Sequence, residues 1–271
     1  MPVPFALVSD DDSYDAVPEH PSGGAVLVLA GSSGRIERDR ADLLAAHGIR
    51  ARAIRWFGGR GQRTVPFEVP LELFIDELER LQRESDRVSI IGTSFGAEAA
   101  LVTATITPVH AAVAISPSSV VWGGVQDGTW SSHWTHEGRP LPWVPFEPTW
   151  TPDTDPPEYR GLYEASMRRD AEATAAAEIP AERISAPVLL TAGGDDRVWP
   201  STEFASAICR RRERRGLPTM SFGAPAAGHR ILLPGESVAA AGGVAMRRGG
   251  TEGADRALGQ QVWPMLLDIL R

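Results

Sequence analysis

Short apolar runs alternate with amphipathic stretches along most of the chain. The runs that predict buried strands are residues 25–30, 51–56, 88–91, 111–115, 188–191 and 219–222. Apolar positions at helical spacing predict helices over residues 35–47, 71–85, 95–106, 201–214 and 258–270. A strand of a parallel sheet is covered on both faces, so it appears in the sequence as a continuous apolar run. The order of these elements predicts an α/β fold with a mostly parallel, doubly wound sheet.

Residues 117–186 interrupt this alternation. The segment contains no clear strand pattern, carries five of the eight tryptophans and is rich in proline at its centre. Helical spacing returns over residues 158–178, where we expect one or two helices. A long segment that leaves a sheet and returns to it is typical of a functional insertion. We therefore predict one α/β domain over residues 1–271, with residues 117–186 inserted as a lid.

Composition excludes several classes of function. The net charge of −8 repels a phosphodiester backbone, so we expect no nucleic-acid partner. The chain has no lysine for Schiff-base chemistry, and its single cysteine, Cys209, cannot form an internal disulfide or a multi-cysteine metal site. No metal or cofactor is expected. The sequence shows no signal peptide and no membrane-spanning run, which predicts a soluble, cytoplasmic protein. It does not indicate the oligomeric state.

A candidate nucleophile lies in Gly92-Thr93-Ser94-Phe95-Gly96, which fits the G-x-S-x-G pattern of a nucleophile elbow. The pattern alone is weak, but an apolar strand runs into it and a helix of small residues follows. Such a turn exposes the Ser94 hydroxyl and lets the neighbouring backbone approach closely. The alternative is an ordinary glycine-rich turn with a solvated serine. The surrounding strand and helix favour the elbow.

The remaining triad members follow from chain order, because in this fold the acid and then the histidine come after the serine. Only His229 lies after the next strand end that carries an acid, in a loop of small residues. Asp195 and Asp196 both follow the strand over residues 188–191. The spacing favours Asp196 as the acid that orients His229, and Asp195 as a turn residue.

Two backbone segments are candidates for an oxyanion hole. The Phe95 N–H opens the helix after the nucleophile, where the helix dipole favours negative charge. The second donor is expected from the loop after the first predicted strand, at Ser32 or Ser33. That loop is also explained as a glycine-rich turn before a helix, and both roles are compatible.

The chain resembles the catalytic domain of the acyl-CoA thioesterase and bile-acid-CoA:amino-acid N-acyltransferase family. The resemblance covers roughly residues 25–271, and the family's triad positions fall on Ser94, Asp196 and His229. It is carried by residues 31–34, 41–48, 69–74, 92–96, 116–123, 179–184, 194–199 and 227–229. It implies attack on an acyl thioester and an acyl-enzyme, with water or an amine as acceptor.

Three features differ from the family pattern. The family's thioesterases carry an extra N-terminal β-sandwich domain, for which this chain is expected to have no room. The acyltransferase branch uses cysteine as nucleophile, so Ser94 favours hydrolysis. Phe95 replaces a small basic residue, which predicts a more apolar entrance.

Three classes of function remain open. They are a thioesterase for CoA-linked or carrier-linked acyl groups, a carboxylesterase for small esters, and a non-enzymatic binding protein of the same fold. The complete triad argues against the third. The arginine run at residues 210–215 is a candidate site for CoA phosphates, although cations at the end of a helix also complement its dipole. Trp122 is the first choice for a residue that lines the acyl pocket.

Overall fold

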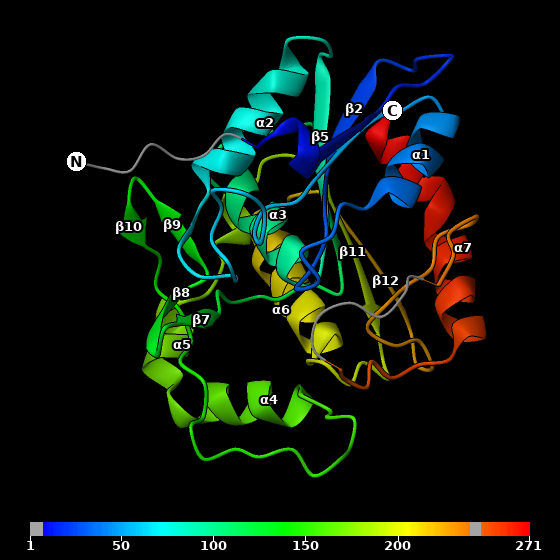
Figure 1. Ribbon diagram of the computed structural model, residues 1–271. Helices are drawn as coiled ribbons and strands as arrows, with labels where there is room; N and C mark the ends of the chain where they lie inside the picture. Colours follow the sequence, from blue (N-terminus) through cyan, green and yellow to red (C-terminus); the bar gives the residue numbers. More distant parts are fainter. Residues whose placement is uncertain (1–7, 239–244) are drawn as a thin grey trace.

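Seven strands form the central sheet (Figure 1). The computed structural model describes residues 8–238 and 245–271, so the first residues of the chain, on which the signal-peptide prediction rests, lie outside it. The strand order is β1 (Ser13–Ala16), β3 (Arg50–Ile54), β2 (Gly24–Leu29), β5 (Arg87–Thr93), β6 (Ala112–Ile115), β11 (Val188–Gly193) and β12 (Thr219–Ala224). Strand β1 runs antiparallel to β3, and all other neighbours are parallel.

Helices cover both faces of this sheet. Helices α2 (Glu72–Gln82), α3 (Phe95–Ala104) and α6 (Ser201–Glu213) pack on one face, and α1 (Arg38–Ala46) and α7 (Glu252–Leu270) on the other. Strand β2 is apolar throughout because both of its faces are covered. Leu27 packs in the core beneath α2, α3 and α6, and Val28 in the core beneath α1 and α7. The predicted α/β fold with a mostly parallel, doubly wound sheet is confirmed.

Element boundaries differ from the sequence prediction mainly at two places. Helix α7 begins at Glu252, six residues before the predicted start, because the Thr251 hydroxyl caps it by accepting a hydrogen bond from the Ala254 N–H at 3.2 Å. Strand β1 was not predicted, since it is a four-residue edge strand that follows the short helix η1 (Asp10–Asp12).

The segment between β6 and β11 contains strands, so the prediction that it has none is wrong. Strands β7 (Gly123–Gln126) and β8 (Thr129–Ser132) form a hairpin, and β9 (Trp134–His136) pairs with β10 (Arg139–Pro140) and β4 (Val69–Pro70). These strands have only two to four residues, too few to show a periodicity. The sequence signal for the hairpin is Asp127-Gly128, which joins β7 to β8 in a turn with positive φ at both positions.

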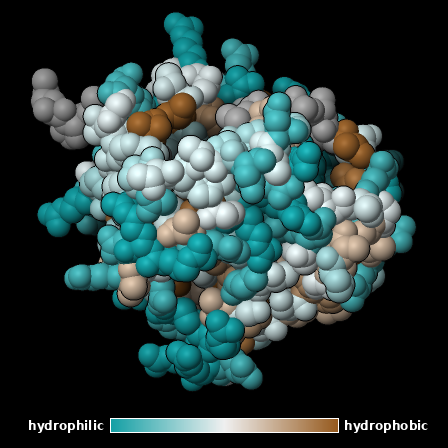
Figure 2. Space-filling model, turned by 90° about the horizontal axis from the view of Figure 1, so that it is seen from below, coloured by the Kyte–Doolittle hydropathy of each residue, from teal (hydrophilic) through white to brown (hydrophobic). Residues whose placement is uncertain are grey.

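The second half of this segment is helical, as expected. Helices α4 (Arg160–Arg169) and α5 (Ala171–Ala176) stand off from the sheet, and the short helix η2 (Ala181–Arg183) leads back to β11 (Figure 1). The surface seen from this side is mainly hydrophilic, and hydrophobic residues form only small separate spots (Figure 2). Within the described residues, no helix is long and apolar enough to cross a membrane.

Candidate active site

Ser94 lies at a sharp turn between β5 and α3. Its φ of 59° and ψ of −124° are unusual for a residue other than glycine, which indicates backbone strain at this position. A Cβ on Gly92 would lie 1.9 Å from the Gly96 carbonyl oxygen, and one on Gly96 would lie 2.4 Å from the Ala30 carbonyl oxygen. Both glycines are therefore needed for the turn to form, and the hydroxyl of Ser94 faces a cavity.

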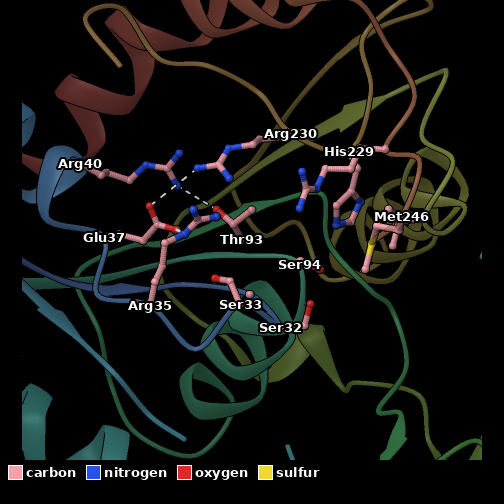
Figure 3. A pocket seen from close by; sticks show the side chains of 13 residues that line it. Ser32, Ser33, Arg35, Glu37, Arg40, Thr93, Ser94, His229, Arg230 and Met246 are labelled. Carbon is pink, nitrogen blue, oxygen red and sulfur yellow. Dashed lines mark hydrogen bonds and ion pairs between the residues drawn. The ribbon is translucent and has the colours of Figure 1, made fainter. Parts of the chain in front are cut away.

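His229 and Asp196 form a buried pair beside this turn. The Nδ1 atom of His229 lies 2.8 Å from Oδ2 of Asp196, and their side chains are 7% and 0% exposed. The other Asp196 oxygen accepts hydrogen bonds from the Val198 and Trp199 N–H groups at 2.8 and 3.2 Å. Ser94 and His229 line the same hollow (Figure 3). The arrangement brings a strained serine, a histidine and a fixed carboxylate together.

The loop that carries His229 is held from two sides. The Ser116 hydroxyl donates to the His229 carbonyl oxygen at 2.7 Å, and the Asp255 carboxylate accepts from the Gly228 N–H at 2.7 Å. Burial raises the pKa of Asp255. The sequence gives neither residue a role, because Ser116 only follows a strand and Asp255 lies just before the helix predicted over residues 258–270.

Asp195 turns away from this pair. Its carboxylate accepts from the Gly250 N–H at 2.9 Å and from Nε of Arg197 at 2.5 Å, and these two contacts lower the pKa of Asp195. Its side chain is 36% exposed. The geometry therefore places Asp196, and not its neighbour, against His229.

The two predicted oxyanion segments both lie next to Ser94. Phe95 is the first residue of α3, so its N–H has no partner within that helix. Ser32 and Ser33 lie in the turn after β2, and both line the hollow with Ser94. A Cβ on Gly31 would lie 2.9 Å from the Ser94 Cβ, so only glycine lets this turn approach the serine. The arrangement could hold an oxyanion between two sets of backbone N–H groups.

A larger cavity of about 880 Å³ also reaches Ser94. Its wall comes mostly from the segment between β6 and β11, and its surface is largely apolar. The aromatic and proline side chains that line it include Phe95, Trp130, Trp143, Phe146, Trp150, Tyr159 and Tyr163. Cavities of this size and character are typical of ligand sites.

Trp122 does not lie where the sequence suggested. It is fully buried, its indole N–H donates to the Ser118 hydroxyl at 2.9 Å, and it packs behind Phe146 and Tyr163. Trp122 is not among the described residues that line the large cavity. The choice of Trp122 as a pocket residue is thus corrected: it supports two residues that do line the cavity.

A buried acid, Glu98, was also missed. It lies on α3, is 0% exposed, and its Oε1 accepts hydrogen bonds from the Trp134 indole at 2.7 Å and the Trp122 N–H at 3.1 Å. The Nδ1 atom of His133 lies 3.3 Å from the same oxygen, and His133 lines the large cavity. In the sequence, Glu98 is one position of a helix of small residues, with no local pattern that marks it as buried.

The arginine run at residues 210–215 lies away from Ser94. Arg211 pairs with Glu178 and, at 2.5 Å, with Glu182. Arg212 is buried and donates to the Thr219 hydroxyl and to four backbone carbonyl groups. None of this run lines the two cavities at Ser94 within the described part of the chain. The run therefore does not line the space around Ser94, where the candidate phosphate site was expected, and Arg211 and Arg212 make structural contacts.

No group of three or more histidine, cysteine, aspartate or glutamate side chains within residues 8–238 and 245–271 could hold a metal ion.

The fold is shared with several solved hydrolases. A putative dienelactone hydrolase from Klebsiella pneumoniae matches with a TM-score of 0.57 at 16% identity, over 95% of this chain and 91% of that one. A puromycin-hydrolysing peptidase from Mycobacterium tuberculosis (TM-score 0.53, 16% identity, 78% of this chain) and the acylaminoacyl peptidase of Pyrococcus horikoshii (0.56, 12%, 94%) also match. This chain covers only 33% and 38% of those two peptidases.

Comparison with curated proteins gives no match. The sequence profile of the family described as "BAAT / Acyl-CoA thioester hydrolase C terminal" matches residues 69–268, which include all three residues of the serine, aspartate and histidine constellation. The match covers most of the chain and agrees with the α/β-hydrolase fold. The chain therefore belongs to the family of BAAT and acyl-CoA thioester hydrolase C-terminal domains.

Proposed function

We propose that the protein is a serine hydrolase that cleaves acyl thioesters through a triad of Ser94, His229 and Asp196. The observation that carries this proposal is the strained Ser94 beside the His229–Asp196 pair, whose Nδ1–Oδ2 distance is 2.8 Å. Membership of a family that includes acyl-CoA thioester hydrolases supports the thioester as substrate.

The proposed reaction has two steps. The Ser94 hydroxyl attacks the thioester carbonyl carbon while His229 takes its proton, and the tetrahedral oxyanion accepts hydrogen bonds from the Phe95 N–H and from a backbone N–H at Ser32 or Ser33. The carbon–sulfur bond then breaks, and the thiolate takes the proton from His229. Water next attacks the acyl-enzyme in the same way, which releases the carboxylic acid and restores Ser94.

The large apolar cavity is the proposed acyl site, and residues 117–186 the proposed lid. Most of the cavity wall belongs to this segment, and the cavity reaches Ser94. We place the acyl chain there because ligand sites for apolar groups are lined by apolar and aromatic side chains.

The test uses a serine-directed fluorophosphonate and a substrate panel. Wild type should be labelled at Ser94, and Ser94→Ala should fold with an unchanged circular dichroism spectrum and remain unlabelled. Labelling of another residue contradicts the assignment. Hydrolysis rates for acyl-CoAs and for 4-nitrophenyl esters of the same acids then separate a thioesterase from a carboxylesterase, which uses the same machinery. Addition of an amine acceptor such as glycine tests transfer in place of hydrolysis.

A further inference from the structure

A second, smaller cavity of about 60 Å³ adjoins the apolar cavity at Ser94. Its wall carries Arg35, Arg40, Arg230 and Arg248, and Figure 3 shows the first three gathered on one side of Ser94. Ser32, Ser94, Val198 and Met246 line both cavities, so the two spaces meet at the proposed nucleophile.

The carboxylates near this cavity do not balance its guanidinium groups. Arg40 is 3% exposed and is neutralised by Glu236, with contacts at 2.6 and 3.1 Å, while its remaining nitrogen donates to the Thr93 hydroxyl at 2.8 Å. Glu37 lies 2.8 Å from Nε of Arg35 and is the only acidic residue that lines the described cavity wall. The cavity therefore carries an excess of positive charge.

Arg230 and Arg248 are the two arginines of this cavity that lack a close carboxylate among the described residues. Arg230 has only a distant one. Its nearest carboxylate oxygen among the described residues belongs to Glu37 at 4.0 Å, too far for a hydrogen bond, although its side chain is only 19% exposed. Burial and the neighbouring guanidinium groups of Arg35 and Arg40 lower the pKa of Arg230 to about 10. The side chain of Arg248 has no ion pair within the described residues. Residues 1–7 and 239–244 contain no acidic side chain, so the undescribed parts of the chain offer no further carboxylate.

We propose that this arginine pocket, formed by Arg35, Arg230 and Arg248 beside Ser32 and Ser33, binds a carboxylate-sized anionic group of the substrate close to the bond that is cleaved. The inference rests on the proposed role of Ser94 and names the class of substrate more closely. A guanidinium group matches an oxyanion in charge and geometry, and such pairs are stronger than neutral hydrogen bonds.

The size of the cavity limits the anion. With about 60 Å³, against about 880 Å³ for the apolar cavity, it suits a group the size of a carboxylate better than a nucleotide. The phosphates of a CoA leaving group lie at the far end of a long pantetheine arm. The substrate thus has an apolar part in the large cavity and an anionic group in the arginine pocket, with the reacting carbonyl at Ser94, where the two cavities meet.

The experiment compares two pairs of substrates at matched ionic strength, because salt screens exposed charges. In the first pair, mono-4-nitrophenyl glutarate carries a carboxylate on the acyl side, and its methyl ester is the neutral control. In the second, the butyryl thioester of 3-mercaptopropionate carries it on the leaving side, with the methyl ester of that thiol as control. We expect wild type to prefer the anionic member of one pair by about tenfold or more in kcat/KM.

Three variants test the arginines. Arg230→Gln and Arg248→Gln should each reduce this preference severalfold, whereas Arg215→Gln, an exposed arginine beyond α6, should leave it as in wild type. The pair that shows the preference identifies the side of the carbonyl that carries the anion. Equal rates for both members of both pairs, or a preference that survives in the Arg230 and Arg248 variants, overturn the proposal.

Failure of this inference differs visibly from failure of the proposed function. If the neutral esters are cleaved and the fluorophosphonate labels Ser94, but no anionic preference exists, only the arginine pocket is refuted. If Ser94 is not labelled, binding still tests the pocket through the melting temperature of Ser94→Ala with added monomethyl glutarate. A rise that is lost in the Ser94→Ala/Arg230→Gln double variant supports the pocket, and no rise refutes it.

Discussion

Replacing Asp196 with asparagine changes one atom of a buried carboxylate, and the structure indicates which way the new amide will turn. The Val198 and Trp199 N–H groups both point at Oδ1 of Asp196, at 2.8 and 3.2 Å. If the amide nitrogen took this place, two buried donors would lose their acceptor, at about 1–3 kcal/mol each. The asparagine oxygen should therefore stay there, and the NH₂ group should face His229.

That orientation reverses the hydrogen bond to the imidazole. In the proposed triad the second oxygen of Asp196, 2.8 Å from Nδ1 of His229, accepts a hydrogen bond from the Nδ1–H, which leaves Nε2 free to act as a base. An amide donor in the same place requires a lone pair on Nδ1, so the proton moves to Nε2. A histidine in this tautomer cannot take the proton of Ser94. We expect kcat to fall by about 10⁴, or about 5.5 kcal/mol, with little change in KM.

The assay is steady-state hydrolysis of a 4-nitrophenyl ester, with the tautomer of His229 read from nitrogen-15 chemical shifts. Asp195→Asn is the matched control, because Asp195 contacts Arg197 and Gly250 in place of the histidine. It should keep kcat within about tenfold of wild type. Comparable losses in the two variants, or a full kcat in Asp196→Asn, would refute the reasoning.

Three further predictions test the surroundings of the site. Trp122→Ala should lower stability to chemical denaturation by about 3–5 kcal/mol while the acyl-chain-length profile keeps its shape, whereas Trp143→Ala, which alters the cavity wall, should shift that profile. A Cβ at Gly31 would approach the Thr93 carbonyl oxygen to 3.0 Å and press on the serine, so Gly31→Ala should reduce kcat by about tenfold to a hundredfold; a normal kcat would mean that the turn can retreat. The hydrogen bond from Arg211 lowers the pKa of Glu182 from 4.5 to about 2, so the stability that this pair contributes is complete above about pH 4.5 and disappears as the pH falls towards 2. The melting temperature of Arg211→Gln should lie below that of wild type at pH 7, and the gap should shrink over this acid range; a constant gap contradicts the assignment.

The parts of the site that the sequence reveals are those encoded locally or by chain order. The turn at Ser94 requires glycine two residues away on either side, because the Gly92 and Gly96 positions contact backbone, and this requirement is visible as a motif. Asp196 and His229 follow from the order of strands along a doubly wound sheet. The strands and helices of the sheet could also be predicted. Strands buried on both faces appear as continuous apolar runs, and the helices that cover them show helical spacing.

The remaining features depend on contacts between distant segments. Trp122 faces Tyr163 and Ser118 because the irregular segment folds back on itself, and the direction of a side chain there is not set by any local period. The arginine pocket joins residues near 40 with residues near 230, and the Arg40–Glu236 pair alone spans 196 positions. Such pairs leave no regular pattern in a single sequence.

The two ends of the segment between β6 and β11 meet at its base. Val120 pairs with Glu178 in an antiparallel bridge, and the Ile179 N–H donates to the Ser119 carbonyl oxygen at 2.9 Å. Its first half is joined to the core through the bond from the Trp134 indole to Glu98. Its second half forms the outer wall of the large cavity, through residues 143–159 and helix α4.

Because the two ends of the segment are bonded to each other, the outer wall of the cavity can be replaced as a unit. A stretch whose ends are already side by side can be shortened, lengthened or replaced by recombination without pulling on the strands that it connects. Acyl preference could then change during evolution, or by grafting residues 145–176 from another protein, while the serine, histidine and aspartate keep their positions.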